Sequence, residues 1–173
     1  MITLITGGIK SGKSKRALDL AALWNSGGRQ PAIRASFIAT AEALDDEMKI
    51  RIEKHKAERA GRGFDTIEEP FDLAAALSRS GSHVIVDCLT MWVNNMMYHK
   101  READFEDALG AFISELRGKQ EAVIVSNETG LGNIPADELT RRYNLMLAAA
   151  ARRTAEAADH VEFMVAGLPL TVK

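Results

Sequence analysis

The sequence of 173 residues predicts an α/β protein in which a mainly parallel β-sheet carries helices on both faces. Three observations predict it. Short apolar runs alternate with longer helix-forming segments along the whole chain. Two of the runs, Val84-Ile85-Val86 and Val123-Ile124-Val125, have the β-branched composition of central strands. A glycine-rich stretch at residues 7–14 joins the first apolar run to the first helical segment.

The individual elements follow from this alternation. The predicted strands are apolar runs bounded by turn-forming residues, at 2–6, 35–39, 65–67 (the weakest), 83–87, 122–126 and 160–166. The predicted helices are the amphipathic or alanine-rich segments near 13–25, 43–60, 71–79, 89–98, 104–117 and 137–157. Loops rich in Gly, Pro, Asn and Ser are predicted at 26–31, 61–63, 80–82 and 127–135. No repeat or linker is visible, so we expect one domain over residues 1–173.

Composition restricts the class of protein. Hydrophobic residues make up 46% and charged residues 27%, as in ordinary globular proteins. A net charge of −2 argues against a broad basic surface for nucleic acid. The single cysteine, Cys88, excludes an intrachain disulfide and favours a reducing compartment. The longest apolar run, residues 145–151, is too short to cross a bilayer, and the N-terminus lacks a basic signal-peptide region. We expect a cytoplasmic protein with no membrane insertion.

The stretch Gly7-Gly8-Ile9-Lys10-Ser11-Gly12-Lys13-Ser14 fits the phosphate-binding pattern G-x-x-x-x-G-K-[ST]. It lies between a predicted strand and a predicted helix, where backbone N–H groups and the helix N-terminus meet a phosphate chain. In such a loop Lys13 reaches the β- and γ-phosphates and the Ser14 hydroxyl binds Mg²⁺. The alternative is a glycine-rich turn without a ligand. The motif predicts a nucleoside triphosphate site and a three-layer P-loop NTPase-like domain.

Asp87 ends an apolar strand, the position at which P-loop enzymes keep the acidic residue that holds Mg²⁺. Asp is also a favoured N-cap, so it could instead begin the following helix. The phosphate loop favours the metal role. The neighbouring Cys88 is interpreted as a small buried residue and not as a nucleophile.

The helix predicted near residues 43–60 carries an unusual face. On a helical wheel one stripe contains Leu44, Met48, Arg51, Ile52, His55 and Arg59. We therefore expect this helix to begin packed on the core and to end facing a cleft. Arg51 and Arg59 lie four residues before and after His55, where their charges oppose imidazolium and leave a nitrogen able to attack phosphorus. They could also hold phosphate oxygens. The alternative is a surface histidine among mixed charges.

Other candidates carry weaker signals. Glu68 and Glu69 precede Pro70, so we expect them on extended chain. They could be site residues, or they could be exposed loop carboxylates. Glu128 follows a predicted strand and precedes a glycine-rich segment. It could contact the substrate, or it could be an ordinary polar loop residue. Parallel sheets bind ligands at the carboxyl ends of their strands, which also draws attention to residues 167–169.

Several collinear motifs resemble one family. They are GGIKSGKS at 7–14, FIATA at 37–41, D-x-E-M-x-x-R-I-x-x-H-x-x-x-R at 45–59, TIEEP at 66–70, VDCLTMW at 86–92, SNE at 126–128 and GLPL at 167–170. Together they look like the bifunctional adenosylcobinamide kinase / adenosylcobinamide-phosphate guanylyltransferase of cobalamin biosynthesis. The phosphate loop is shared by many enzymes, whereas the histidine helix and the VDCLT segment are much more specific.

This resemblance implies two reactions. The terminal phosphate of ATP or GTP passes to adenosylcobinamide, and GTP then guanylylates a histidine, which gives GMP to adenosylcobinamide phosphate. The guanylylated histidine matches His55. The family's nucleotide contacts match Gly7, Gly8, Ile9, Lys10, Ser11, Gly12, Lys13, Ser14, Ala39, Thr40, Ala41, Lys56, Ala57, Glu58, Arg59, Glu68 and Asp87. The resemblance also implies a homotrimer.

The sequence departs from the family pattern at Lys10, where Arg is more usual, and at Phe64, where Trp is common. Two other functions stay open on the residues alone. One is a small P-loop kinase without a histidine intermediate. The other is a nucleotide-binding switch, although the N-K-x-D motif typical of guanine-specific switches is absent from the sequence.

Overall fold

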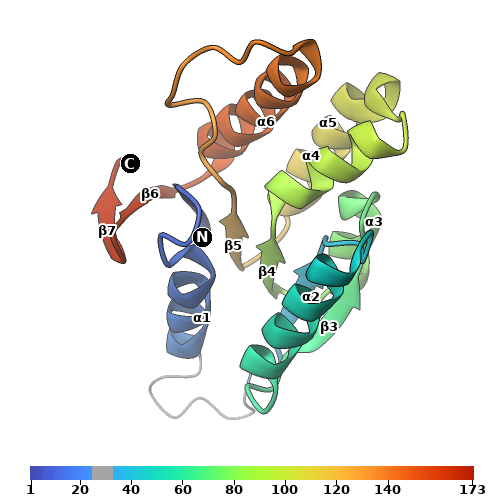
Figure 1. The fold of residues 1–173 in the computed structure, drawn as a ribbon. Coiled ribbons are helices and arrows are strands. Elements are labelled where there is room, and N and C mark those ends of the chain that lie inside the picture. The colour runs from blue at the N-terminus through green and yellow to red at the C-terminus, as the bar shows by residue number, and fades with distance from the viewer. Residues whose placement is uncertain (25–32) are drawn as a thin grey trace.

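A computed structural model describes residues 1–24 and 33–173. The described residues form a seven-stranded sheet of order β3-β2-β4-β5-β1-β6-β7 (Figure 1). The strands are β1 (Ile2–Gly7), β2 (Ser36–Ala39), β3 (Asp65–Glu68), β4 (His83–Asp87), β5 (Glu121–Val125), β6 (His160–Val165) and β7 (Leu168–Thr171). All neighbouring pairs are parallel apart from β6 and β7. The predicted α/β class with a mainly parallel sheet is confirmed.

The helices cover both faces. They are α1 (Lys13–Leu23), α2 (Asp46–Arg59), α3 (Leu73–Arg79), α4 (Leu89–Tyr98), α5 (Phe105–Leu116) and α6 (Glu138–Ala157), with a 3-10 turn at Glu102–Asp104. Each predicted helix is present within a few residues of its expected bounds. Asp side chains at 45, 72 and 137 accept hydrogen bonds from N–H groups of the first turns of α2, α3 and α6, which explains where these helices begin. The loop predicted at 26–31 lies outside the described residues.

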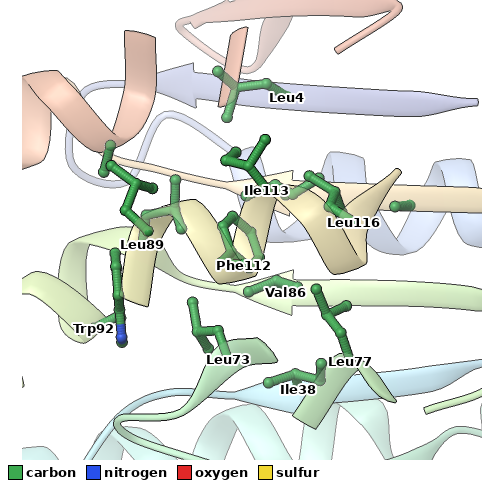
Figure 2. Packing of buried hydrophobic residues seen from close by; sticks show 14 of the residues in the cluster. Leu4, Ile38, Leu73, Leu77, Val86, Leu89, Trp92, Phe112, Ile113 and Leu116 are labelled. Carbon is green, nitrogen blue, oxygen red and sulfur yellow. The ribbon is translucent and has the colours of Figure 1, made fainter. Parts of the chain in front are cut away.

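Alternate residues of the central strands supply two cores, one on each face of the sheet. Val84 and Val86 of β4 pack with α3, α4 and α5, whereas Ile85 packs with α1. Figure 2 shows the larger cluster, in which Trp92 and Phe112 are completely buried. The Trp92 Nε1–H donates to the Phe71 carbonyl at 2.7 Å, so this tryptophan packs in the core with its polar group satisfied. No described helix is long and apolar enough to span a membrane.

The C-terminal hairpin differs from the prediction. Residues 168–171 form the edge strand β7, which was not among the predicted strands. Pro169 made this strand hard to predict, because proline weakens a strand pattern in the sequence. Proline is nevertheless tolerated in an edge strand such as β7. Ala166 and Gly167 have φ values of 51° and 86°, a two-residue turn that reverses the chain. The Gly167 N–H donates to the Ser11 carbonyl at 3.1 Å, so this turn contacts the phosphate loop.

Candidate nucleotide site

The glycine-rich stretch forms a loop between β1 and α1, as predicted. Gly7 has φ of 147°, and a Cβ there would lie 2.7 Å from the Met164 carbonyl oxygen, so only glycine fits. Gly12 is the left-handed N-cap of α1, with φ of 95°. Lys13 is only 7% exposed, and its Nζ donates to the Gly8 carbonyl at 2.6 Å. The ammonium group is thus held over the loop that would enclose phosphates.

Asp87 lies at the carboxyl end of β4, where several predicted site residues converge on it. Burial raises the pKa of Asp87, although the nearby Ser14 hydroxyl and the charges of His55, Arg59 and Lys13 act in the opposite direction. The N-cap of α4 is Cys88, so the alternative role of Asp87 as that N-cap is wrong. Burial also raises the pKa of the Cys88 thiol to about 11, which agrees with an unreactive thiol.

A cavity of about 370 Å³ opens beside Asp87, between α2 and the carboxyl ends of β2, β3 and β4. The predicted site residues that line it are Ala39, Ala41, Arg51, His55, Lys56, Arg59, Glu68 and Asp87. Glu69, a weaker candidate from the sequence, also lines it. The other lining residues were not predicted as site residues, and they are Phe37, Glu42, Ala43, Met48, Lys49, Ile52, Glu53, Pro70, Cys88 and Met91. The signal that could have found Pro70 is its place just after a strand, whereas Phe37 lies inside a strand and offers no such signal.

Helix α2 meets the cavity along its length and not only at its end. None of its residues is buried, and Leu44 before it is 40% exposed, so the expectation that the helix begins packed on the core is wrong. Met48 and Ile52 line the cavity instead. The helix is too rich in charged residues to offer a continuous apolar stripe to the sheet. Its last turn is attached by the Lys56–Glu68 ion pair at 2.8 Å.

Arg59 is held in an environment suited to an anion. Its guanidinium carbon lies 4.3 Å from the ring centroid of Phe37. Within the part of the chain that the structure describes, its Nε is buried without a hydrogen-bond partner. Burial lowers the pKa of Arg59, while Asp87 and Glu68 raise it. A buried, unpaired N–H donor on a cavity wall favours a ligand that supplies an acceptor.

Four predicted contacts lie elsewhere. Thr40 is completely buried: its hydroxyl donates to the Cys88 carbonyl and accepts from the Cys88 N–H, both at 2.8 Å. Its backbone groups bond to Asp87 and Asn95, so Thr40 supports the cavity wall and does not face the cavity. Ala57 and Glu58 are exposed outside the cavity. Glu128 lines a separate cavity of about 270 Å³ beside α6. Its backbone N–H donates to the Gly7 carbonyl at 3.0 Å.

Comparison with known proteins decides the family. Residues 3–172 match the model of the family described as "Cobinamide kinase / cobinamide phosphate guanyltransferase". The chain belongs to this family. The kinase/guanyltransferase family description fits an enzyme with the phosphate loop and the histidine-lined cavity of this structure, and it places the chain in cobalamin biosynthesis.

The relatives match over their whole length. The chain is 41% identical to the bifunctional adenosylcobalamin biosynthesis protein CobP of Pseudomonas aeruginosa, covering 100% of this chain and 98% of that protein. It is 30% identical to the bifunctional adenosylcobalamin biosynthesis protein CobU of Salmonella typhimurium, covering 100% of both. The crystal structure of the flagellar accessory protein FlaH from Methanocaldococcus jannaschii aligns with a TM-score of 0.53 at 14% identity. It covers 99% of this chain and 77% of that one, a similarity of fold alone.

Asp87→Asn is expected to stabilise the metal-free protein at neutral and alkaline pH. Because the folded-state pKa of Asp87 is raised, the ionised carboxylate opposes folding, and its cost grows as the pH rises above the unfolded-state value. The gain should shrink at acidic pH, where the wild-type carboxyl is protonated. Urea unfolding across pH with a chelator measures it, with the exposed Asp107→Asn as control. A variant less stable than wild type at alkaline pH contradicts the prediction.

Proposed function

We propose that this protein phosphorylates adenosylcobinamide with ATP or GTP and then converts the product to adenosylcobinamide-GDP, through GMP carried on His55. The observation that supports this is the position of His55 on a cavity wall with Asp87, whose pKa the phosphate-loop residues Ser14 and Lys13 act to lower. A nucleophilic imidazole and a triphosphate loop then belong to one site. A simple kinase needs the loop but has no use for the histidine.

In the first reaction the substrate hydroxyl attacks the γ-phosphorus and the nucleoside diphosphate leaves. Phosphoryl transfer of this kind depends mainly on positioning and on neutralising charge. The backbone N–H groups of residues 7–14 and the N-terminus of α1 would bind the phosphates, and Lys13 would take the β- and γ-oxygens.

In the second reaction a ring nitrogen of His55 attacks the α-phosphorus of GTP. A P–N bond forms, the bond from the α-phosphorus to the bridging oxygen breaks, and pyrophosphate leaves. The imidazole then releases its remaining ring proton. A phosphate oxygen of adenosylcobinamide phosphate next attacks the same phosphorus, the P–N bond breaks, and the departing imidazole takes up a proton to restore the free histidine. Covalent catalysis thus divides one transfer into two easier steps.

Magnesium fits this proposal. The Ser14 hydroxyl is near enough to the Asp87 carboxylate to act on its pKa, and both are the hard oxygen ligands that Mg²⁺ prefers. Bound there, the ion would neutralise charge that develops on the phosphates. Mg²⁺ usually needs only one or two protein ligands beside phosphate and water, so a larger acidic cluster is not required.

One time course tests the function. Purified protein is incubated with adenosylcobinamide, GTP and Mg²⁺, and the corrinoid products are followed by chromatography with mass detection. We expect adenosylcobinamide phosphate first and adenosylcobinamide-GDP afterwards. Accumulation of the phosphate alone would favour the simple kinase, and GTP binding without any corrinoid product would favour the switch.

We also propose a cytoplasmic homo-oligomer, a trimer by family resemblance, that acts as one domain. Exposed apolar side chains along the edge strand and the C-terminus support association, namely Leu168, Leu170 and Val172. The partners in this proposal are the two corrinoid substrates, with no nucleic acid and no membrane insertion. The single cysteine supports the reducing compartment.

A further inference from the structure

Three side chains at four-residue intervals on α2 line the cavity: Arg51, His55 and Arg59. At this spacing they lie one above another on the same side of the helix. The nucleophile is therefore flanked by one cation on the side of the helix N-terminus and another on the side of its C-terminus. These two cations have different surroundings, and that difference suggests different tasks.

Arg51 is the unpaired cation of this face. Lys49 pairs with Asp46 at 2.8 Å, and Lys56 pairs with Glu68 at 2.8 Å. Arg59 stacks on Phe37. Among the residues that the structure describes, Arg51 has no ion pair and no side-chain hydrogen bond, although it lines the cavity. Its full set of N–H donors is available to an anion.

The two arginines also face different parts of the site. The positive charge of Arg51 is among the causes that lower the pKa of Lys13, the lysine of the phosphate loop. The charges that act on Asp87 are those of His55, Arg59 and Lys13. Arg51, one helical turn before His55, is thus near enough to the phosphate-loop lysine to act on its pKa, whereas Arg59, one turn after His55, acts on Asp87 and stacks on Phe37.

We propose that Arg51 is a catalytic residue for guanylylation, binding the pyrophosphate as it leaves the α-phosphorus of GTP. This role rests on the proposed His55 intermediate. When the bond from the α-phosphorus to the bridging oxygen breaks, its electron pair stays with pyrophosphate, which gains negative charge beside Lys13. A guanidinium neutralises such oxygens with paired hydrogen bonds that strengthen as the charge develops.

If Arg51 binds pyrophosphate, it should act in only one of the two half-reactions of GMP transfer. Pyrophosphate takes part when GMP is loaded onto His55 and, in reverse, when guanylyl-enzyme and pyrophosphate regenerate GTP. It takes no part when GMP passes from His55 to adenosylcobinamide phosphate. Arg51 should therefore matter far more for the pyrophosphate-dependent half-reaction than for the transfer to the corrinoid.

The test begins with guanylyl-enzyme made from GTP labelled at the α-phosphorus and freed of nucleotide. One portion receives pyrophosphate and the other adenosylcobinamide phosphate, and the loss of label from the protein is timed. For Arg51→Gln we expect the pyrophosphate-dependent rate to fall about 10- to 100-fold, as for a lost hydrogen bond to a charged group. Arg51→Lys should recover part of this loss, because it keeps the charge without the planar fork.

Lys54→Gln is the matched control, since it removes one positive charge from α2 at an exposed position outside the cavity. It should leave both rates as in wild type. Equal losses in the two half-reactions of Arg51→Gln, or no loss in either, overturn the assignment, and a match between Arg51→Gln and Lys54→Gln does the same. A wild-type protein that takes up no label overturns the histidine intermediate itself, and with it the role of Arg51.

Discussion

His55→Ala is expected to abolish covalent guanylylation. Wild-type protein incubated with GTP labelled at the α-phosphorus should retain label that is lost in acid and stable in base, as a phosphoramidate requires, and the variant should retain none. The loss should be complete because, among the described residues that line the cavity, His55 is the one imidazole. Scintillation counting of the denatured protein measures the label.

The same variant should still form adenosylcobinamide phosphate, since the hydroxyl attacks the γ-phosphorus directly and no step of that reaction uses the imidazole. His160→Ala is the control for loss of a histidine, because His160 is exposed at the start of β6. It should be labelled like wild type. If His55→Ala still retains label, the nucleophile is another residue. If the variant also loses phosphorylation of adenosylcobinamide, the substitution has disrupted the whole site.

Local sequence was sufficient to predict the phosphate loop and most of the sheet. Glycine-rich turns and β-branched runs are determined by nearby residues, so β1, β4 and β5 appear where the sequence places them. β7 could not be found in this way, because its four residues become a strand only by pairing with β6. Tertiary pairing decides such short edge segments.

The site residues, like the strands, were predictable only where local sequence determines them. The helical period alone grouped Arg51, His55 and Arg59, and they do line one cavity. The helical period could not predict what this face of α2 packs against, because a helical wheel gives the direction of each side chain and not its neighbours. It therefore assigned Met48 to the core, whereas the structure assigns it to the cavity. The place of the Thr40 side chain outside the cavity has a related reason: its hydroxyl is hydrogen-bonded to Cys88, 48 residues away in sequence.

Lys13→Ala is expected to reduce both activities by about 100- to 1000-fold, the cost of removing one preorganised charged donor from developing charge. Both reactions place a triphosphate in the same loop, so a single substitution should impair phosphorylation of adenosylcobinamide and labelling of His55 alike. Initial rates of the two reactions at saturating GTP measure the losses. Lys15→Ala is the matched control, because the Lys15 side chain is 81% exposed and pairs with Asp19 on the surface of α1.

The loss in Lys13→Ala should not come from unfolding. Burial is the largest cause that lowers the pKa of Lys13, so the charged ammonium opposes folding at neutral pH and its removal relieves that cost. Urea unfolding should therefore show a variant at least as stable as wild type. Lys13→Ala would then lose both reactions while His55→Ala loses one, the pattern required of one triphosphate site that serves two nucleophiles. Guanylylation that survives in Lys13→Ala would instead require a second nucleotide site, and the phosphate loop would serve the kinase alone.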